Sequence, residues 1–69
     1  MDKYSRVLYW SAEDNAWIAE VPELEFCAAD GPTPQGALAE VENAVQRWLD
    51  VAREEGWEIP QPKGRLAVG

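Results

Sequence analysis

The first half of the chain alternates short apolar runs with turn-forming residues, the pattern of an antiparallel β-meander. Residues 4–10 (Tyr-Ser-Arg-Val-Leu-Tyr-Trp) are rich in aromatic and β-branched side chains and predict a strand, and the polar residues 11–15 predict a hairpin loop after it. Residues 16–21 predict a second strand that stops at Pro22, because proline cannot donate to a sheet ladder. Residues 25–29 predict a short third strand, so we expect three strands in an antiparallel meander.

The second half of the chain has the periodicity of one amphipathic helix. Thr33 and Pro34 are typical of a helix start, because the threonine hydroxyl accepts from a free first-turn N–H and proline at the first position loses no hydrogen bond. Gly56 favours a left-handed position at the other end. Between these ends the apolar residues recur at helical spacing and predict a helix over residues 34–55. They are Leu38, Val41, Ala44, Val45, Trp48, Leu49 and Ala52.

Beyond the helix, the prolines within residues 59–64 predict an extended linker, since each proline restricts its predecessor to extended backbone. Residues 65–68 predict a final strand, which would lie parallel to its neighbour through a right-handed crossover. The whole pattern predicts one α+β domain over residues 1–69, with a three-stranded antiparallel meander, one long helix packed on it and a short fourth strand.

Composition narrows the class of protein. The chain has 69 residues, 13 acidic and 6 basic side chains, a net charge of −7, no histidine and one cysteine. A chain of this size buries only about 60% of the surface that its unfolded form exposes, so we expect a single domain.

The acidity argues against direct nucleic-acid binding, because that affinity depends on Lys and Arg neutralising phosphates. The lone Cys27 cannot form an intramolecular disulfide, which favours the cytoplasm. No apolar run approaches the roughly 20 residues of a membrane span.

The chemistry-bearing side chains do not form a known kind of catalytic pattern. Without histidine, the usual triads and zinc sites are not expected. Glu13 and Asp14 lie in the predicted hairpin loop, and Glu23 and Glu25 lie next to the third strand, so we expect solvated surface acids. Cys27 is expected to be a buried apolar residue rather than a nucleophile. We therefore expect no enzyme activity and no catalytic, metal-binding or cofactor-binding site.

Four tryptophans are a surplus in a chain this short. Trp48 lies on the apolar stripe of the helix and Trp57 at its end, so we expect core packing for both. Trp10 and Trp17 lie on the first two strands, where apolar side chains occupy both faces of the hairpin. One helix covers only one face of a sheet, and tryptophan is enriched at the centres of interfaces. We therefore expect Trp10 and Trp17 to contact a partner or a second copy of the chain.

Two segments resemble the N-terminal domain of HicB-type antitoxins. They are residues 13–27 (Glu-Asp-Asn-Ala-Trp-Ile-Ala-Glu-Val-Pro-Glu-Leu-Glu-Phe-Cys) and residues 30–38 (Asp-Gly-Pro-Thr-Pro-Gln-Gly-Ala-Leu). The family typically has an acidic-glycine turn, an aromatic residue, A-x-V-P-x-L-P-G-C, a short strand, G-D-T and an E-E-A-L helix start. The similarity continues through Trp48 and Leu49 to the prolines of residues 59–62, which is nearly the whole chain.

This resemblance implies a partial ribonuclease H-like fold, with the fourth strand beside the first. It implies a non-catalytic antitoxin role, in which the domain binds a small basic HicA-type toxin that cleaves mRNA and covers its active site. It also implies a homo-oligomer, either a dimer or a tetramer. Glu13, Asp14, Glu23 and Glu25 are then expected to steer the basic partner, because complementary charge raises association rates and selects partners.

The chain departs from the family pattern in three places. Asn15 and Ala16 replace the usual turn glycine, and asparagine tolerates the left-handed conformation nearly as well as glycine. Residues 25 and 26 (Glu-Phe) replace proline-glycine before Cys27, which is expected to lengthen or straighten the third strand. The sequence ends at Gly69, where complete antitoxins of this type continue into a helix-turn-helix or ribbon-helix-helix segment, so we expect a stand-alone domain without that DNA-binding part.

Two other hypotheses stay open at this point. An orphan oligomeric domain would bind another protein or a small ligand, and a ligand-binding module requires a pocket lined by Trp10 or Trp17. A minimal ribonuclease H-like hydrolase requires clustered carboxylates on the first strand and the helix that hold a divalent metal. No carboxylate occurs between Tyr4 and Trp10, which disfavours the hydrolase.

Overall fold

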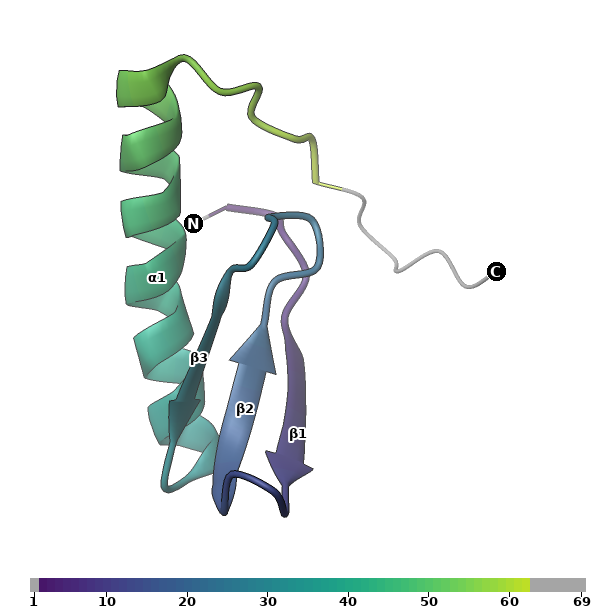
Figure 1. The fold of residues 1–69 in the computed structure, drawn as a ribbon. Helices are drawn as coiled ribbons and strands as arrows, with labels where there is room; N and C mark the ends of the chain where they lie inside the picture. Colours follow the sequence, from purple (N-terminus) through teal and green to yellow (C-terminus); the bar gives the residue numbers. More distant parts are fainter. Residues whose placement is uncertain (1, 63–69) are drawn as a thin grey trace.

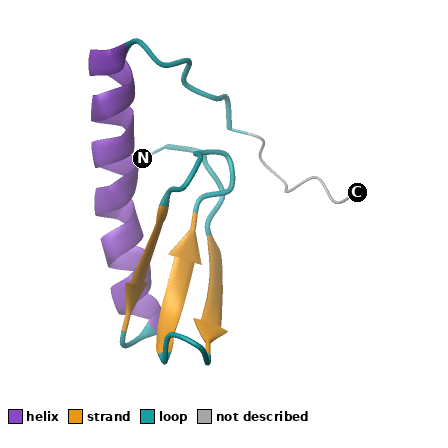
Figure 2. Cartoon of the chain, in the orientation of Figure 1, coloured by secondary structure: helices purple, strands orange, loops and turns teal. Residues whose placement is uncertain are grey.

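The computed structural model describes residues 2–62. Its elements are β1 (Val7–Ser11), β2 (Ala16–Glu20), β3 (Ala28–Gly31) and α1 (Pro34–Glu55). The three strands form one antiparallel sheet in the order β1-β2-β3, and α1 packs against it (Figure 1, Figure 2). The predicted α+β architecture, with an antiparallel meander and one long helix, is confirmed. The predicted strand of residues 65–68 lies outside the described residues.

β1 begins at Val7, three residues later than the sequence indicates. The backbone N–H groups before it bond to side chains instead of a neighbouring strand. That of Tyr4 donates to Asp2 Oδ1 at 3.0 Å, and that of Ser5 donates to the carboxylate of Glu23 at 3.1 and 3.2 Å. Side-chain acceptors therefore decide where this strand starts, and strand propensity does not reveal them.

β3 begins at Ala28 rather than at residue 25, because the preceding loop closes on itself. The N–H of Leu24 donates to the carbonyl of Val21, that of Cys27 to the carbonyl of Leu24, and that of Val21 to the carbonyl of Cys27, all within 3.1 Å. Phe26 has a left-handed backbone, with φ at 60°. The expectation that residues 25 and 26 lengthen or straighten the third strand is wrong, since Phe26 keeps the turn that a glycine would make.

The strand register decides which side chains face the helix. Trp10 pairs with Trp17, and Leu8 pairs with Ala19. Directly opposed residues point to the same face of a sheet. Ala19 is fully buried in the core under α1, so all four side chains lie on the helix side and the alternate residues face away.

The helix covers the sheet unevenly. α1 packs mainly over β3 and β2, and β1 lies at its margin. Leu8 and Trp10 consequently stay 39% and 48% exposed although they face the helix side. On the opposite face Tyr9 is also exposed, and its hydroxyl donates to Glu20 Oε2 at 2.7 Å. Exposed apolar side chains thus occur on both faces of the hairpin.

The core fills the space between α1 and the sheet. Its buried residues are Ala19, Val21, Leu24, Cys27, Ala37, Val41, Val45 and Leu49. Close approach of β3 to the first turn of α1 depends on Gly31, because a Cβ there would lie 2.7 Å from the backbone nitrogen of Ala37 and 2.9 Å from the carbonyl carbon of Gly36.

Both ends of α1 have local causes. Thr33 has extended backbone, its side chain accepts from the N–H of Gly36 at 2.9 Å, and Pro34 follows it as the first helical residue. At the other end Gly56 has φ at 71°, and its N–H donates to the carbonyl of Ala52. Within residues 2–62, no helix is both long enough and apolar enough to cross a bilayer.

Candidate functional site

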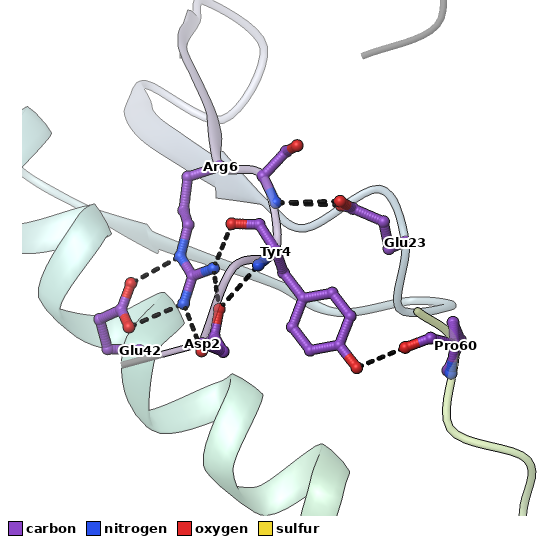
Figure 3. Close-up of polar contacts among 7 residues, drawn as sticks. Asp2, Tyr4, Arg6, Glu23, Glu42 and Pro60 are labelled. Carbon is purple, nitrogen blue, oxygen red and sulfur yellow. Dashed lines mark hydrogen bonds and ion pairs between the residues drawn. The ribbon is translucent and has the colours of Figure 1, made fainter. Parts of the chain in front are cut away.

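A network around Arg6 holds the N-terminal segment (Figure 3). Nε and Nη2 of Arg6 donate to the two carboxylate oxygens of Glu42 at 2.7 and 2.8 Å, and Nη1 donates to Asp2 Oδ1 at 2.6 Å. Nη1 also donates to the carbonyl of Tyr4, whose hydroxyl donates to the carbonyl of Pro60 at 2.6 Å. The carboxylate of Glu42 therefore connects the start of the chain to α1, and the hydroxyl of Tyr4 connects it to the segment after α1.

Acid is expected to weaken this network. The hydrogen bond from Arg6 holds the pKa of Asp2 below its ordinary value of 3.8, so the charged form stabilises the fold at neutral pH. That stability is present above about pH 4 and is lost as the pH falls through the lowered pKa. We expect Asp2→Asn to lower the free energy of unfolding at neutral pH and to flatten its decline in acid, measured by urea denaturation between about pH 2 and 7.

Asp50→Asn is the matched control for this prediction. Asp50 accepts from Arg53 at 3.3 Å on an exposed face of α1, where an ion pair contributes little. It is expected to leave the acid dependence unchanged. An Asp2→Asn variant with the acid profile of the wild type would contradict the role given to Asp2.

Glu23 is buried and hydrogen-bonded. Its side chain is 7% exposed, and its carboxylate accepts from the N–H of Ser5. The expectation of a solvated surface acid is therefore wrong for Glu23. The loop between β2 and β3 folds it toward the N-terminal segment, where the hydrogen bonds offset the cost of burying a charge.

Cys27 is buried, as expected, with 6% exposure. Burial raises the pKa of its thiol, which disfavours the thiolate that nucleophilic chemistry and metal binding require. Over residues 2–62, no group of three or more His, Cys, Asp and Glu is placed to hold a metal ion.

The two hairpin tryptophans contact each other. Trp10 and Trp17 have ring centroids 5.7 Å apart at an interplanar angle of 70°, an edge-to-face pair. Trp17 is partly buried against the core, whereas Trp10 is 48% exposed at the margin of α1. Trp10 is therefore the member of the pair that is available to another molecule.

The remaining predicted residues lie at two opposite ends of the sheet (Figure 1). Glu13 and Asp14 are exposed in the β1–β2 loop, and the Asp14 N–H donates to the hydroxyl of Ser11 at 3.2 Å. Asn15 supplies the left-handed residue of this loop, with φ at 52°. Glu25 lies in the β2–β3 loop at the other end, where its carbonyl accepts from Nε1 of Trp48 on α1. The predicted residues therefore do not form one site.

A second aromatic cluster lies at that other end. Phe26, Trp48, Trp57 and Glu25 line a hollow of about 560 Å³, which we call the aromatic hollow. The rings of Trp48 and Trp57 have centroids 5.6 Å apart at 65°, and Nε1 of Trp48 donates to the carbonyl of Glu25 at 2.9 Å. This bond ties α1 to the β2–β3 loop and orients the Trp48 ring.

The structure corrects the expectation of core packing for Trp57. Trp48 is partly buried against the core, but Trp57 is 50% exposed. The left-handed backbone of Gly56 turns the chain back, and the N–H of Trp57 donates to the carbonyl of Ala52 at 2.8 Å. The Trp57 ring then contacts Trp48 at the margin of the helix instead of entering the core.

Phe26 is the most unusual residue of the aromatic hollow. It is 95% exposed and has φ at 60°, a region that bulky side chains rarely adopt. A left-handed backbone costs a non-glycine residue about 1–2 kcal/mol. Burial in the core does not offset this cost, because almost the whole side chain faces solvent.

Phe26→Gly is expected to stabilise the fold relative to Phe26→Ala by about 1 kcal/mol. Both variants remove the ring, but only glycine adopts the left-handed backbone without strain. Urea denaturation of the two variants and the wild type measures the difference. Equal midpoints for the glycine and alanine variants would contradict the strain assigned to residue 26.

The sequence held one sign of the aromatic hollow. Residues 25 and 26 depart from the proline-glycine of the HicB pattern, and this departure introduces the exposed ring and the carboxylate. The contact of Trp48 with the β2–β3 loop joins residues 23 positions apart. The sequence pattern of the loop or of the helix alone therefore does not show that these aromatic side chains lie together.

Comparison with known proteins adds one relative. No family model matches the chain, and no solved structure matches it. The UPF0150 protein ssl0259 of Synechocystis sp. is 31% identical over 64 residues, which cover 93% of this chain and 86% of that protein. The similarity extends through the sheet and the helix rather than over a single motif. The chain belongs to the UPF0150 family.

Proposed function

We propose that this chain is a non-catalytic, antitoxin-like interaction domain of the HicB type, which binds and neutralises a small basic HicA-type toxin that cleaves mRNA. One observation carries the proposal: an acidic chain, with net charge −7, exposes the rings of Phe26 and Trp57 in the aromatic hollow, outside its own core. Exposed aromatic side chains are typical of interface centres, and the acidity complements a basic partner.

The sequence and the described acids support a binding role over a catalytic one. The chain resembles the N-terminal domain of HicB-type antitoxins over nearly its whole length. The carboxylates of Asp2, Glu42 and Glu23 accept hydrogen bonds from Arg6 and Ser5, so they serve the fold. Cleavage of RNA by the purified protein with Mg²⁺ or Mn²⁺ would overturn the non-catalytic assignment.

Co-expression tests the proposed function. The chain is produced together with the small basic protein encoded beside it, and the pair is examined by co-purification and by rescue of growth from the toxin. We expect a complex that survives purification and relieves the growth arrest. If the neighbouring protein neither co-purifies nor loses toxicity, and no HicA-type toxin is neutralised, the antitoxin function is wrong.

We also propose that the chain forms a homo-oligomer, a dimer or a tetramer, through the hairpin. Trp10 and Leu8 are exposed at the margin of α1, and Tyr9 is exposed on the opposite face. Residues 7–11 of this edge strand carry no charged side chain, so copies of an acidic chain meet there with little repulsion. Sedimentation is expected to show a species larger than 7.7 kDa that shrinks in Trp10→Ala. A monomer at micromolar concentration would overturn this proposal.

A further inference from the structure

We infer that the aromatic hollow receives an arginine side chain of the basic partner. The inference rests on the proposed function, because it names the group that the partner inserts. It assigns separate roles to the two ends of the sheet: the hairpin, with Trp10, serves self-association, and the aromatic hollow serves the partner.

The aromatic hollow has one fixed ring and two accessible ones. Trp48 is held by its hydrogen bond to the carbonyl of Glu25 and by its edge-to-face contact with Trp57. Trp57 is 50% exposed and Phe26 is 95% exposed. The volume of about 560 Å³ lies within the range of sites that enclose small molecules, so one side chain of a partner fits.

The surrounding charge selects a cation over an apolar side chain. Glu25 lines the aromatic hollow, and Glu55 lies two helical turns after Trp48 on the same side of α1. Both glutamates are exposed. An apolar side chain gains nothing from them, whereas a cation is attracted both by the carboxylates and by the faces of the rings.

The basic side chains of the helix do not fill this role. Arg47 precedes Trp48, so it projects about 100° further round the helix. Arg53 already pairs with Asp50 at 3.3 Å. Neither described arginine of α1 is therefore placed to balance the glutamates beside the rings, and we expect the partner to supply the cation.

Arginine fits this arrangement better than lysine. Its guanidinium is planar and stacks on aromatic faces, and tryptophan is the strongest partner for such contacts. Its fork of N–H donors also matches a carboxylate, which Glu25 provides beside the rings. Lysine would bring the charge without the stacking.

The strained backbone of Phe26 supports a binding role for its ring. A glycine would make the same turn at lower cost, yet the chain carries an exposed aromatic ring at φ 60°. Strained residues that the core does not explain are found at binding sites. The ring of Phe26 is therefore expected to matter to the partner and not to folding.

Titration with a model peptide tests the site without the toxin. The wild-type chain is titrated with acetyl-Gly-Gly-Arg-Gly-Gly-amide, and the indole N–H signals of the tryptophans are followed by NMR. We expect saturable shifts at Trp48 and Trp57 but not at Trp10, and smaller shifts with a peptide that carries methionine in place of arginine. Equal shifts with both peptides, or shifts with neither, would overturn the inference.

Variants then connect the site to the toxin. Phe26→Gly and Trp57→Ala are each expected to weaken toxin binding about fivefold or more. Leu38→Ala is the matched control, because it removes an exposed apolar side chain (39% against 50% for Trp57) from the N-terminal part of α1, outside the aromatic hollow. Phe26→Gly remains folded because it relieves strain, so weakened binding reports the lost ring. Toxin binding that withstands both substitutions would overturn the inference while leaving the proposed function intact.

The two proposals fail in different ways. If the arginine peptide binds at Trp57 but no toxin is captured, the site stands and the antitoxin function fails. If Phe26→Gly abolishes self-association in sedimentation, a second copy of the chain occupies the aromatic hollow, and the inference is wrong.

Discussion

Gly31→Ala is expected to destabilise the domain by about 2–3 kcal/mol, although it adds a single methyl group. The new Cβ would lie 2.7 Å from the backbone nitrogen of Ala37 and 2.9 Å from the carbonyl carbon of Gly36. Both atoms belong to the backbone of the first turn of α1, so the clash cannot be relieved by a change of rotamer. β3 and the helix must move apart, which loosens the core between them. The midpoint of urea denaturation measures the effect.

Gly36→Ala is the control for this prediction. Its Cβ would meet mainly the side-chain oxygen of Thr33 at 3.0 Å, which can move, and alanine is the better helix former by about 1 kcal/mol. We expect its stability to stay within about 1 kcal/mol of the wild type. Equal losses of stability in Gly31→Ala and Gly36→Ala would contradict the role given to the close approach of β3 to α1.

Leu24→Ala is expected to cost about 3 kcal/mol, a large part of the stability of a domain this small. Leu24 lies in the β2–β3 loop, yet its side chain is only 1% exposed and belongs to the core cluster. Its backbone also bonds to Val21 and Cys27, so the loop has little freedom to collapse into the cavity left behind. Thermal and urea denaturation measure the loss.

Leu38→Ala is the matched substitution on the helix. Leu38 is 39% exposed, so the same change removes less buried surface, and we expect a loss below about 1 kcal/mol. A Leu24→Ala variant that unfolds no more readily than Leu38→Ala would contradict the role of the loop as part of the core.

The helix and the hairpin were predictable from the sequence because their causes are local. Thr33, Pro34 and Gly56 occupy the positions at which their own backbone preferences begin and end a helix. Asn15 likewise supplies the left-handed residue of the hairpin loop. Thr33 bonds to Gly36 and Gly56 to Ala52, so these hydrogen-bond partners lie within a few positions in the sequence.

The surroundings of the acidic side chains were less predictable, because burial of a side chain depends on parts of the chain that are distant in sequence. Glu23 is adjacent to a turn-forming proline, which suggests exposure, but it is buried, and its carboxylate accepts a hydrogen bond from the N–H of Ser5, 18 positions away. Asp2 and Glu42 have surface-like sequence contexts and meet at Arg6. Glu13 and Asp14 remain exposed at the hairpin, as expected.

By itself, the sequence determined the element order, the class of fold and both ends of the helix, because propensity, caps and hydrophobic period act between near neighbours. The tertiary structure alone decided that Gly31 is a contact point, that Leu24 is core and that Trp57 is surface. It also brought Phe26 together with Trp48 of α1 and with Trp57, which follows α1, in the aromatic hollow. The physical reason is that exposure and contact depend on which elements pack together. Glu25 of the loop and Trp48 of the helix are 23 positions apart and meet only after the chain folds.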